Sequence, residues 1–275
     1  MNRLLGACLV YPLSDRKAKW QERWALRRRR WPGFCTVCGQ WTRFIKIDPN
    51  FRESCPCEKC GATNRQRQMA LVSAFGCPPG PGLVGRLPAL RQMARIPSLT
   101  IYNTESNGSF HQQLSAIPGY VCSEYFGPEH RSGETVGGVL HQDLQACSFA
   151  DESFDLVLSS DVMEHIPDPY RAHGEIYRIL KKGGRHIFTV PFYHTLFRDE
   201  LRARIAEDGQ LVHLKEPWYH GDPVRPDQGV LVFRVFSMEM LVRLEEIGFR
   251  SRLYQLYQPW FGILGSNAIV FVAEK

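Results

Sequence analysis

Short apolar runs alternate with amphipathic segments along the second two-thirds of the chain. The runs are typical of strands buried on both faces of a sheet. They lie at residues 99–103, 119–123, 137–141, 154–159, 185–190, 251–257 and 267–273. Between the fifth and sixth runs, residues 237–248 place Met240, Leu241, Leu244 and Ile247 on one helical face before Gly248. This alternation predicts an α/β domain with a doubly wound, mostly parallel sheet of seven strands.

The stretch from Phe154 to Phe192 carries the clearest local pattern. After its first apolar run, Asp168 supplies a helix N-cap and Pro169 a favoured first helical residue. The cations and glycines of residues 181–184 predict the end of that helix. A second apolar run follows, so the stretch is predicted to be one strand–helix–strand unit of a parallel sheet.

This unit contains DVMEHIPDP at 161–169 and EIYRILKKGG at 175–184, and it resembles the fourth through fifth strands of class I S-adenosylmethionine-dependent methyltransferases. The resemblance extends over residues 97–275 and implies the family's Rossmann-like fold, in which the final strand inserts antiparallel. It implies methyl transfer from S-adenosylmethionine. It also implies that residues 193–236 are the variable insertion after the fifth strand, which would form a lid or a substrate wall.

The resemblance implies a cofactor loop after the first strand, although the loop departs from the family pattern of an acid followed by spaced glycines. Asn103 stands where the acid is usual, Glu105 replaces a glycine, and only Gly108 remains nearby. Glycine lets the backbone approach the cofactor closely, so this departure leaves two interpretations: an altered loop that still binds, or a pseudoenzyme.

The resemblance also implies cofactor contacts at the following strand ends. Glu124 would accept hydrogen bonds from the ribose hydroxyls, Asp143 would contact the adenine amino group, and Leu144 would pack on the ring. The alternatives are a solvated loop glutamate and a helix-capping aspartate. The predicted cofactor-binding residues are Asn103, Thr104, Glu105, Gly108, Glu124, Asp143, Leu144 and Ser160.

Asp161, Glu164 and His165 follow the fourth strand, where open α/β sheets bind ligands. Similar acid-x-x-Glu-His stretches in ubiquinone-pathway O-methyltransferases bind a divalent metal. By that resemblance the three residues are a candidate Mg²⁺ site, the alternative being a metal-free stretch that shapes the pocket.

Methyl transfer also needs a group that removes the acceptor's proton, and histidine suits this role near neutral pH. The candidate bases are His165, His194, His213 and His220. We predict His165 and His194 as the catalytic residues, because both lie close to the carboxyl ends of predicted strands.

Cysteine spacing predicts a zinc-ribbon-like module before the α/β domain. Cys35-x2-Cys38 and, after 18 residues, Cys57-x2-Cys60 fit a tetrahedral Zn²⁺ site with four thiolates. Four protein ligands leave no open position, so the zinc would be structural. Cys55 is an alternative to Cys57. The odd total of nine cysteines predicts a reducing compartment, hence a cytoplasmic protein.

Positive charge concentrates near the N-terminus. The chain carries a net charge of +6, and residues 14–31 alone supply eight Lys or Arg against two acids. The neutral remainder, together with the absence of an Asn-Pro-Pro-Tyr-type motif, favours a small-molecule, lipid or glycan acceptor. The basic segment, interleaved with tryptophans, predicts either nucleic-acid or anionic-membrane contact or, alternatively, a solvated helix whose tryptophans pack on the body.

The predicted organisation is a basic leader at 1–34, a four-cysteine zinc module at 35–75 ending in a helix, a linker and helix at 76–96, and a methyltransferase domain at 97–275. No apolar run approaches the ~20 residues that a membrane-spanning helix needs, and residues 4–13 do not fit a signal peptide. Two alternatives to a small-acceptor enzyme remain. One is an RNA-modifying methyltransferase that binds RNA through the zinc module and residues 27–30; the other is a non-catalytic adaptor with the same fold.

Overall fold

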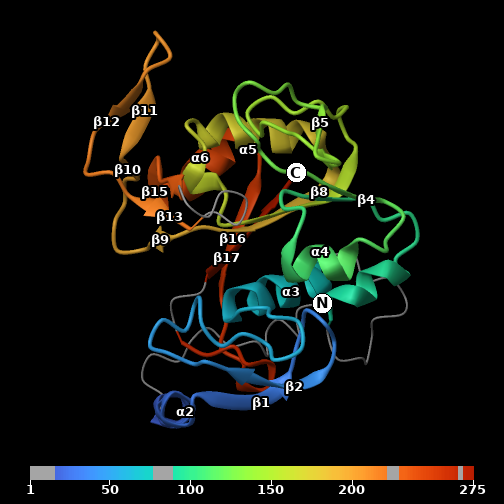
Figure 1. The fold of residues 1–275 in the computed structure, drawn as a ribbon, viewed down its shortest axis with the longest axis vertical. Coiled ribbons are helices and arrows are strands. Elements are labelled where there is room, and N and C mark those ends of the chain that lie inside the picture. The colour runs from blue at the N-terminus through green and yellow to red at the C-terminus, as the bar shows by residue number, and fades with distance from the viewer. Residues whose placement is uncertain (1–15, 77–88, 222–228, 266–268) are drawn as a thin grey trace.

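A mixed sheet of six strands forms the centre of the protein. The computed structural model describes residues 16–76, 89–221, 229–265 and 269–275 (Figure 1). Its central sheet has the order β16–β17–β8–β7–β3–β4. The bounds are β3 (Ile101–Asn103), β4 (Tyr120–Cys122), β7 (Phe154–Ser160), β8 (Leu180–Thr189), β16 (Arg250–Gln255) and β17 (Ile269–Glu274). Five strands run in the same direction, and only β17 runs antiparallel, between β8 and β16, which confirms the predicted α/β class.

The prediction of seven strands is wrong by one, because residues 137–141 do not add a strand to the sheet. Instead β5 (Thr135–Val136) and β6 (Val139–Leu140) pair with each other in a separate hairpin. Its turn consists of Gly137 and Gly138, with φ of +57° and +85°, a conformation that folds the chain back on itself. A single parallel bridge from Glu124 to His141 is all that continues the sheet beyond β4 among the described residues.

Helices cover both faces of the sheet (Figure 1). On one face, α5 (Pro169–Ile179) and α6 (Met238–Ile247) pack on Val157, Phe188 and Phe271. On the other, α3 (Asn64–Gly76) packs on Leu156, Leu158 and Val272. The side chains of β7 alternate between these two cores, as expected of a central strand buried on both faces. The helix α3 directly follows the cysteines in the sequence. Nevertheless, it packs on the central sheet and forms part of the helical layer on that face.

Local signals set most helix ends. The Asp168 side chain accepts from the backbone N–H groups of Tyr170 and Arg171 at 3.2 and 3.1 Å, as predicted for an N-cap. The predicted glycine end of α5 is wrong: the helix ends at Ile179, and residues 181–184 lie on β8. The helix expected at 83–96 is a 3₁₀ helix, η1 (Leu90–Arg95), where it can be described. The linker at 77–82 and the leader before Arg16 lie outside the described residues.

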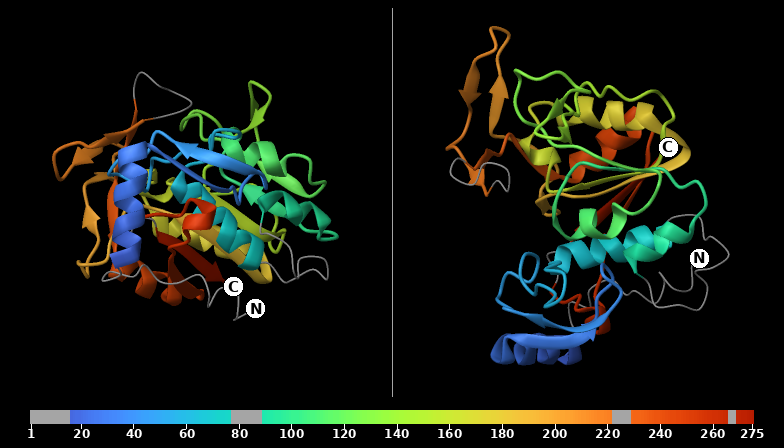
Figure 2. Two further views of the ribbon diagram at one scale, coloured as in Figure 1. Left: turned by 90° about the horizontal axis from the view of Figure 1, so that it is seen from below. Right: turned by 45° about the vertical axis from the view of Figure 1, so that its right-hand side comes forward.

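The N-terminal elements pack against the connection between β16 and β17. They are α2 (Arg16–Arg28) and the antiparallel pair β1 (Arg30–Phe34) and β2 (Trp41–Ile45) (Figure 2). Trp31 Nε1 donates to Pro259 O at 2.7 Å, in the 3₁₀ helix η3 (Pro259–Phe261) of that connection. At Gly33, a Cβ atom would lie 2.5 Å from Trp260 O, so only glycine allows this approach.

The insertion after β8 is built from short β pairs. The hairpin of β11 (Ala203–Ile205) and β12 (Leu211–His213) projects from the body (Figures 1 and 2). A second pair joins β13 (Tyr219–His220) to β14 (Val230–Leu231). The remaining strands are β9 (Phe192–Tyr193), β10 (Glu200–Leu201) and β15 (Arg234–Ser237), in the order β10–β15–β9. Among the described residues, no helix is both long and apolar enough to cross a bilayer.

The buried guanidinium of Arg67 joins the cysteine loops to α3 and to the β16–β17 connection. It is fully buried and donates to the carbonyl oxygens of Cys55, Ala62, Phe261 and Gly262 at 2.8, 2.6, 3.0 and 2.9 Å. Its Cζ lies 3.9 Å from the centre of the Phe44 ring. Four carbonyls on three segments thus depend on one side chain.

We expect Arg67→Met to lower the free energy of unfolding by about 3–5 kcal/mol, because the buried carbonyls would lose their donor. Chemical denaturation followed by circular dichroism measures this. The matched control is Arg43→Met, which removes an exposed partner of Glu58 and should cost less than about 1 kcal/mol. Equal effects in the two variants would contradict this role for Arg67.

Candidate functional site

A pocket of about 650 Å³ opens at the carboxyl ends of β3, β4 and β7. Its lining includes Thr104 and Glu105 after β3, Glu124 after β4, and Ser160 at the end of β7. The insertion closes it with Ile205, Val230 and Phe233 among others. This is the edge at which open α/β sheets bind ligands, and the volume suits a ligand of cofactor size.

The loop after β3 is fixed by hydrogen bonds of Asn103 and exposes other residues to the pocket. Asn103 is buried, and its Nδ2 donates to Glu105 O at 2.8 Å and to the Tyr120 hydroxyl at 3.0 Å. Asn103 therefore braces the loop and does not line the pocket. Gly108, with φ of +78°, begins α4 (Gly108–Leu114) and is also absent from the lining. Of the four loop residues predicted to bind the cofactor, the structure places Thr104 and Glu105 in the pocket.

Two buried polar atoms of this loop have no hydrogen-bond partner among the described residues: Thr104 Oγ1 and Glu105 Oε1. Burial raises the pKa of Glu105 to about 7, against the opposing charge of Arg65. Buried polar atoms are nearly always satisfied, so a bound ligand with polar or positively charged groups fits this end of the pocket.

Glu124, after β4, and Asp143, after the β5–β6 hairpin, both line the pocket, and both accept hydrogen bonds from backbone N–H groups. Glu124 Oε1 accepts from the backbone N–H and the hydroxyl of Ser106 at 2.8 and 2.9 Å, which ties it to the cofactor loop. Asp143 Oδ1 accepts from Gln145 N at 2.9 Å within a turn, and no helix begins there for it to cap. Leu144 is buried beside it and lines the same wall.

Two histidines meet beside the pocket: His165 lines it, and His220, directly before the lining residue Gly221, lies just outside the lining. His165 Nδ1 lies 2.8 Å from Leu231 O, which makes this nitrogen the donor and Nε2 the acceptor. His220, from β13, places its Nδ1 3.3 Å from His165 Nε2. Burial lowers the pKa of His220, so its ring is neutral at pH 7. His194, the other predicted catalytic residue, is exposed on the turn after β9 and lies outside the lining, and His213 is exposed on β12.

Glu164 lies next to the His165–His220 pair. It is fully buried, its two carboxyl oxygens have no hydrogen-bond partner among the described residues, and Oε1 is 3.8 Å from His165 Nε2 and from His220 Nδ1. Burial, with a smaller effect from the charge of Asp161, raises the pKa of Glu164 well above its ordinary value. Burial therefore favours the protonated form of Glu164.

The candidate Mg²⁺ set of Asp161, Glu164 and His165 is not assembled. Asp161 instead receives two hydrogen bonds from the Arg52 guanidinium, at 2.7 and 2.6 Å. Burial alone would raise the pKa of Asp161, but Arg65 and Arg52 hold it well below its ordinary value. The ligand-type atoms that do come together, within 4.8 Å, belong to Glu164, His165 and His220. The ion pairs of Asp161 were invisible in the sequence, because Arg52 is 109 residues away.

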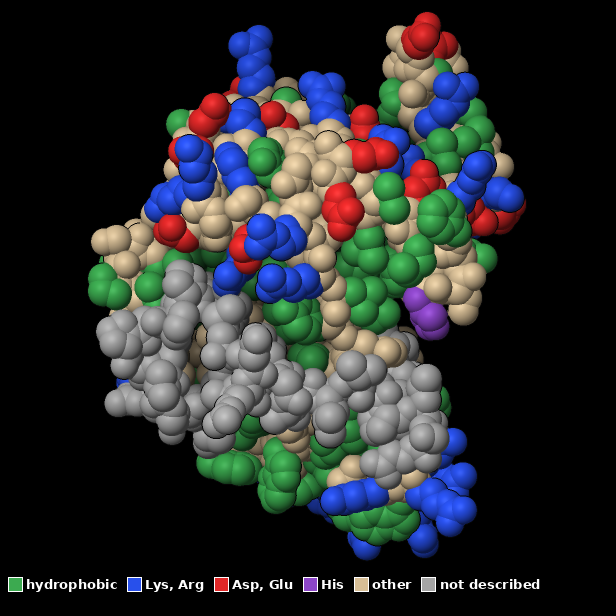
Figure 3. Space-filling model, turned by 180° about the vertical axis from the view of Figure 1, so that it is seen from behind, with side chains coloured by type: hydrophobic (Ala, Val, Ile, Leu, Met, Phe, Trp, Pro, Cys, Tyr) green, Lys and Arg blue, Asp and Glu red, His purple; other side chains and the backbone are tan. Residues whose placement is uncertain are grey.

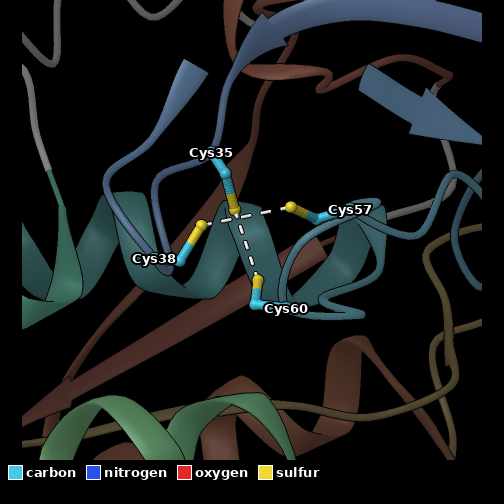
Figure 4. A group of neighbouring side chains, drawn as sticks. All are labelled: Cys35, Cys38, Cys57 and Cys60. Carbon is cyan, nitrogen blue, oxygen red and sulfur yellow. Dashed lines mark hydrogen bonds between the residues drawn. The ribbon is translucent and has the colours of Figure 1, made fainter. Parts of the chain in front are cut away.

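The four predicted zinc ligands converge (Figure 4). The Sγ atoms of Cys35, Cys38, Cys57 and Cys60 lie within 4.8 Å of one another, with Cys35 to Cys60 at 3.7 Å and Cys38 to Cys57 at 4.0 Å. Zn–S bonds of ~2.3 Å in a tetrahedron require sulfur separations of about 3.8 Å. Cys55 lies outside the group and contacts the Ser54 hydroxyl at 3.6 Å.

Comparison with known proteins shows which family the chain resembles. Residues 124–188 match a methyltransferase domain family. The protein therefore contains a methyltransferase domain in this part of the chain. An uncharacterized methyltransferase of Mycobacterium marinum is 28% identical over 134 residues, 48% of this chain and 52% of the relative. One of Mycobacterium avium is 26% identical over 160 residues, 52% of this chain and 63% of the relative.

The chain thus spans about half the length of the first of these curated relatives. A crystal structure of an S-adenosylmethionine-dependent methyltransferase from Mesorhizobium loti is 16% identical, with a TM-score of 0.41, and covers 67% of this chain and 95% of that chain. The family match runs from the end of β4 into β8 and includes Glu124, Asp143 and His165. The cysteines and the insertion of this methyltransferase lie outside it.

A basic surface covers α2 and the start of β1. Its eight cations are mostly exposed (Figure 3, lower right); they are Arg16, Lys17, Lys19, Arg23, Arg27, Arg28, Arg29 and Arg30. Trp20 is 63% exposed, whereas Trp24 and Trp31 pack edge to face at 5.3 Å. Two of the tryptophans are thus packed, as the solvated-helix interpretation expects, while Trp20 remains on the surface with the cations and contact with nucleic acid or a membrane stays a prediction.

We expect Cys57→Ser to lose bound zinc and Cys55→Ser to retain about one equivalent, since only the Cys57 sulfur belongs to the four-sulfur group. Metal analysis of the purified variants measures this. Retention of zinc by Cys57→Ser together with its loss from Cys55→Ser would reverse the assignment.

Proposed function

We propose that the protein transfers the methyl group of S-adenosylmethionine to an oxygen or nitrogen atom of a small-molecule, lipid or glycan acceptor. The observation that carries this proposal is one pocket with two chemically distinct ends. Unpartnered buried oxygens on Thr104 and Glu105, found so among the described residues, mark one end, and His165 marks the other, with His220 in contact with it from just outside the lining.

The first end fits the cofactor. Glu124 keeps its carboxylate at the pocket wall beside the loop, where it can accept from ribose hydroxyls, and Leu144 offers an apolar surface for the adenine. Bound there, the cofactor supplies an electrophilic methyl group on a positively charged sulfur. An ionised Glu105 would attract that charge, which compensates for the glycines missing from the loop.

The second end fits proton removal. Leu231 O fixes the Nδ1 proton of His165, and His165 Nε2 in turn orients the Nδ1 proton of His220. The remaining nitrogen of His220 is then the basic atom that would take a proton from the acceptor hydroxyl or amine. We therefore assign proton removal to His220, oriented by His165, in place of His194.

The lining favours a small acceptor over a polyanion. It contains the carboxylates Glu105, Glu124, Asp143 and Asp161 and, among its described residues, no lysine or arginine. Apolar side chains of the insertion, including Ile205 and Phe233, complete the wall. A phosphate-rich chain would meet repulsion here, whereas a sugar, lipid headgroup or small metabolite would not.

One observation favours the RNA-modifying alternative: the eight cations and the exposed Trp20 on the basic surface. Cations that neutralise phosphates make binding strongly salt-dependent, and an exposed indole can stack on a base. RNA binding that weakens steeply with salt and is lost on reversing the charges of residues 27–30 would support this alternative.

We expect calorimetric titration of the zinc-loaded protein to give micromolar binding of S-adenosylmethionine and S-adenosylhomocysteine. Glu124→Gln should weaken both by about ten- to a hundredfold, because it removes a charged acceptor while its amide oxygen can still accept from Ser106. Glu246→Gln, on the exposed side of α6, is the control. Absence of binding to a folded wild-type protein would leave the non-catalytic adaptor.

We expect the preference for S-adenosylmethionine over S-adenosylhomocysteine to grow between pH 6 and pH 8. Glu105, with a pKa of about 7, loses its proton over that range, and its carboxylate would then attract the sulfonium that only the former carries. The ratio of the two dissociation constants should change about three- to tenfold. Glu105→Gln should flatten this profile; an unchanged slope in that variant would assign the effect elsewhere.

A further inference from the structure

Two arginines from the cysteine region contact residues that line the pocket, although neither arginine lines it itself. Arg52 lies between β2 and Cys55, and Arg65 lies in the first turn of α3. Their side chains are only 13% and 12% exposed, and both guanidiniums contact Asp161 at the end of β7. Arg52 binds it through two nitrogens at 2.7 and 2.6 Å, and Arg65 Nε lies 3.3 Å from Oδ2.

Asp161 needs this support because its backbone is in the left-handed region. Its φ is +55°, which residues other than glycine adopt reluctantly. Besides the arginines, Thr189 holds it: the Thr189 hydroxyl donates to Asp161 Oδ1 at 3.0 Å, and Asp161 N donates to Thr189 O at 3.0 Å. This turn points the chain from β7 toward Val162 and His165, both of which line the pocket.

Arg65 also fixes the neighbouring hydroxyls. It donates to Ser160 Oγ, which lines the pocket, and to Thr189 Oγ1 at 3.2 Å. Glu53 accepts from Arg65 Nε at 3.1 Å and also pairs with Arg52, so the two guanidiniums are held in register. Bidentate and network pairing of this kind fixes geometry as well as charge.

A second contact from the same helix reaches the other side of the cofactor loop. Gln66 Oε1 accepts from the Ser109 hydroxyl at 3.2 Å, in α4 directly after the loop. The residues Arg65 and Gln66, adjacent in α3, therefore touch both the β7 turn and the segment that follows β3. The charge of Arg65 also opposes the rise in the pKa of Glu105.

We propose that Arg52 and Arg65 are positioning residues of the methyl-transfer site, which makes the cysteine region a working part of that site. They hold Asp161 in its left-handed turn and keep Ser160 at the pocket wall. Without either arginine, a buried Asp161 carboxylate would remain short of a partner beside Glu105 and Glu164, and the turn would relax. The inference rests on the proposed function.

The test compares Arg52→Gln and Arg65→Gln with wild type by calorimetric titration of S-adenosylhomocysteine, alongside zinc content and thermal melting. Both variants should retain zinc and weaken cofactor binding at least about tenfold. Arg43→Gln, which breaks the exposed pair with Glu58 in the same region, should bind like wild type. Adding Asp161→Asn to Arg52→Gln should restore part of the affinity, because it removes the stranded charge.

Two results would distinguish a positioning role from a purely structural one. The first is the rescue by Asp161→Asn. The second is that Arg65→Gln should gain its preference for S-adenosylmethionine over S-adenosylhomocysteine at a higher pH than wild type does. Folded glutamine variants that bind the cofactor like wild type would overturn the inference while leaving the proposed function intact. If wild type itself fails to bind, the proposed function fails instead. If the glutamine variants lose zinc, the lysine variants Arg52→Lys and Arg65→Lys test the inference instead. They should bind S-adenosylhomocysteine about threefold more weakly than wild type, and unchanged binding would contradict the inference.

Discussion

The burial of Arg67 beside the cysteine cluster is the interaction on which the arrangement of the other parts depends. A guanidinium without solvent is tolerated only where its N–H groups find acceptors and negative charge lies near. Four carbonyls supply the acceptors, and the cysteine sulfurs lie within electrostatic range. Four thiolates around one Zn²⁺ leave a net negative charge, so zinc and Arg67 would stabilise each other in the fold.

The helix α3, which contains Arg67, contacts both the central sheet and the wall of the pocket. Its buried residues, which include Leu71 and Val72, cover the central sheet, while Arg65 at its start contacts Ser160 at the pocket wall. The two roles come from different parts of one helix, its first turn and the turns that follow. Metal-site geometry, sheet packing and pocket geometry are therefore mechanically connected through a helix of 13 residues.

Sequence patterns were sufficient for the features that are local. Alternating runs predicted the α/β class, Asp168-Pro169 predicted the start of α5, and paired cysteines predicted which sulfurs would meet. They failed where long-range geometry decides. A glycine pair at 137–138 turned an expected strand into a hairpin, and nothing local distinguished His220 from His194 as the partner of His165. The pairing of Arg52 with Asp161 likewise depends on how distant loops dock, which spacing does not encode.

The place of α3 in the sheet's covering layer has a consequence for any shortened form of the chain. Cutting away residues 1–75 would not detach an appendage; it would uncover Leu156, Leu158, Ile187 and Val270, which α3 now shields from water. Such a fragment would present a fresh apolar face and tend to aggregate, whatever its ligands. The cysteine region and the sheet share one apolar core, so questions about the basic surface are better asked by reversing its charges than by removing it.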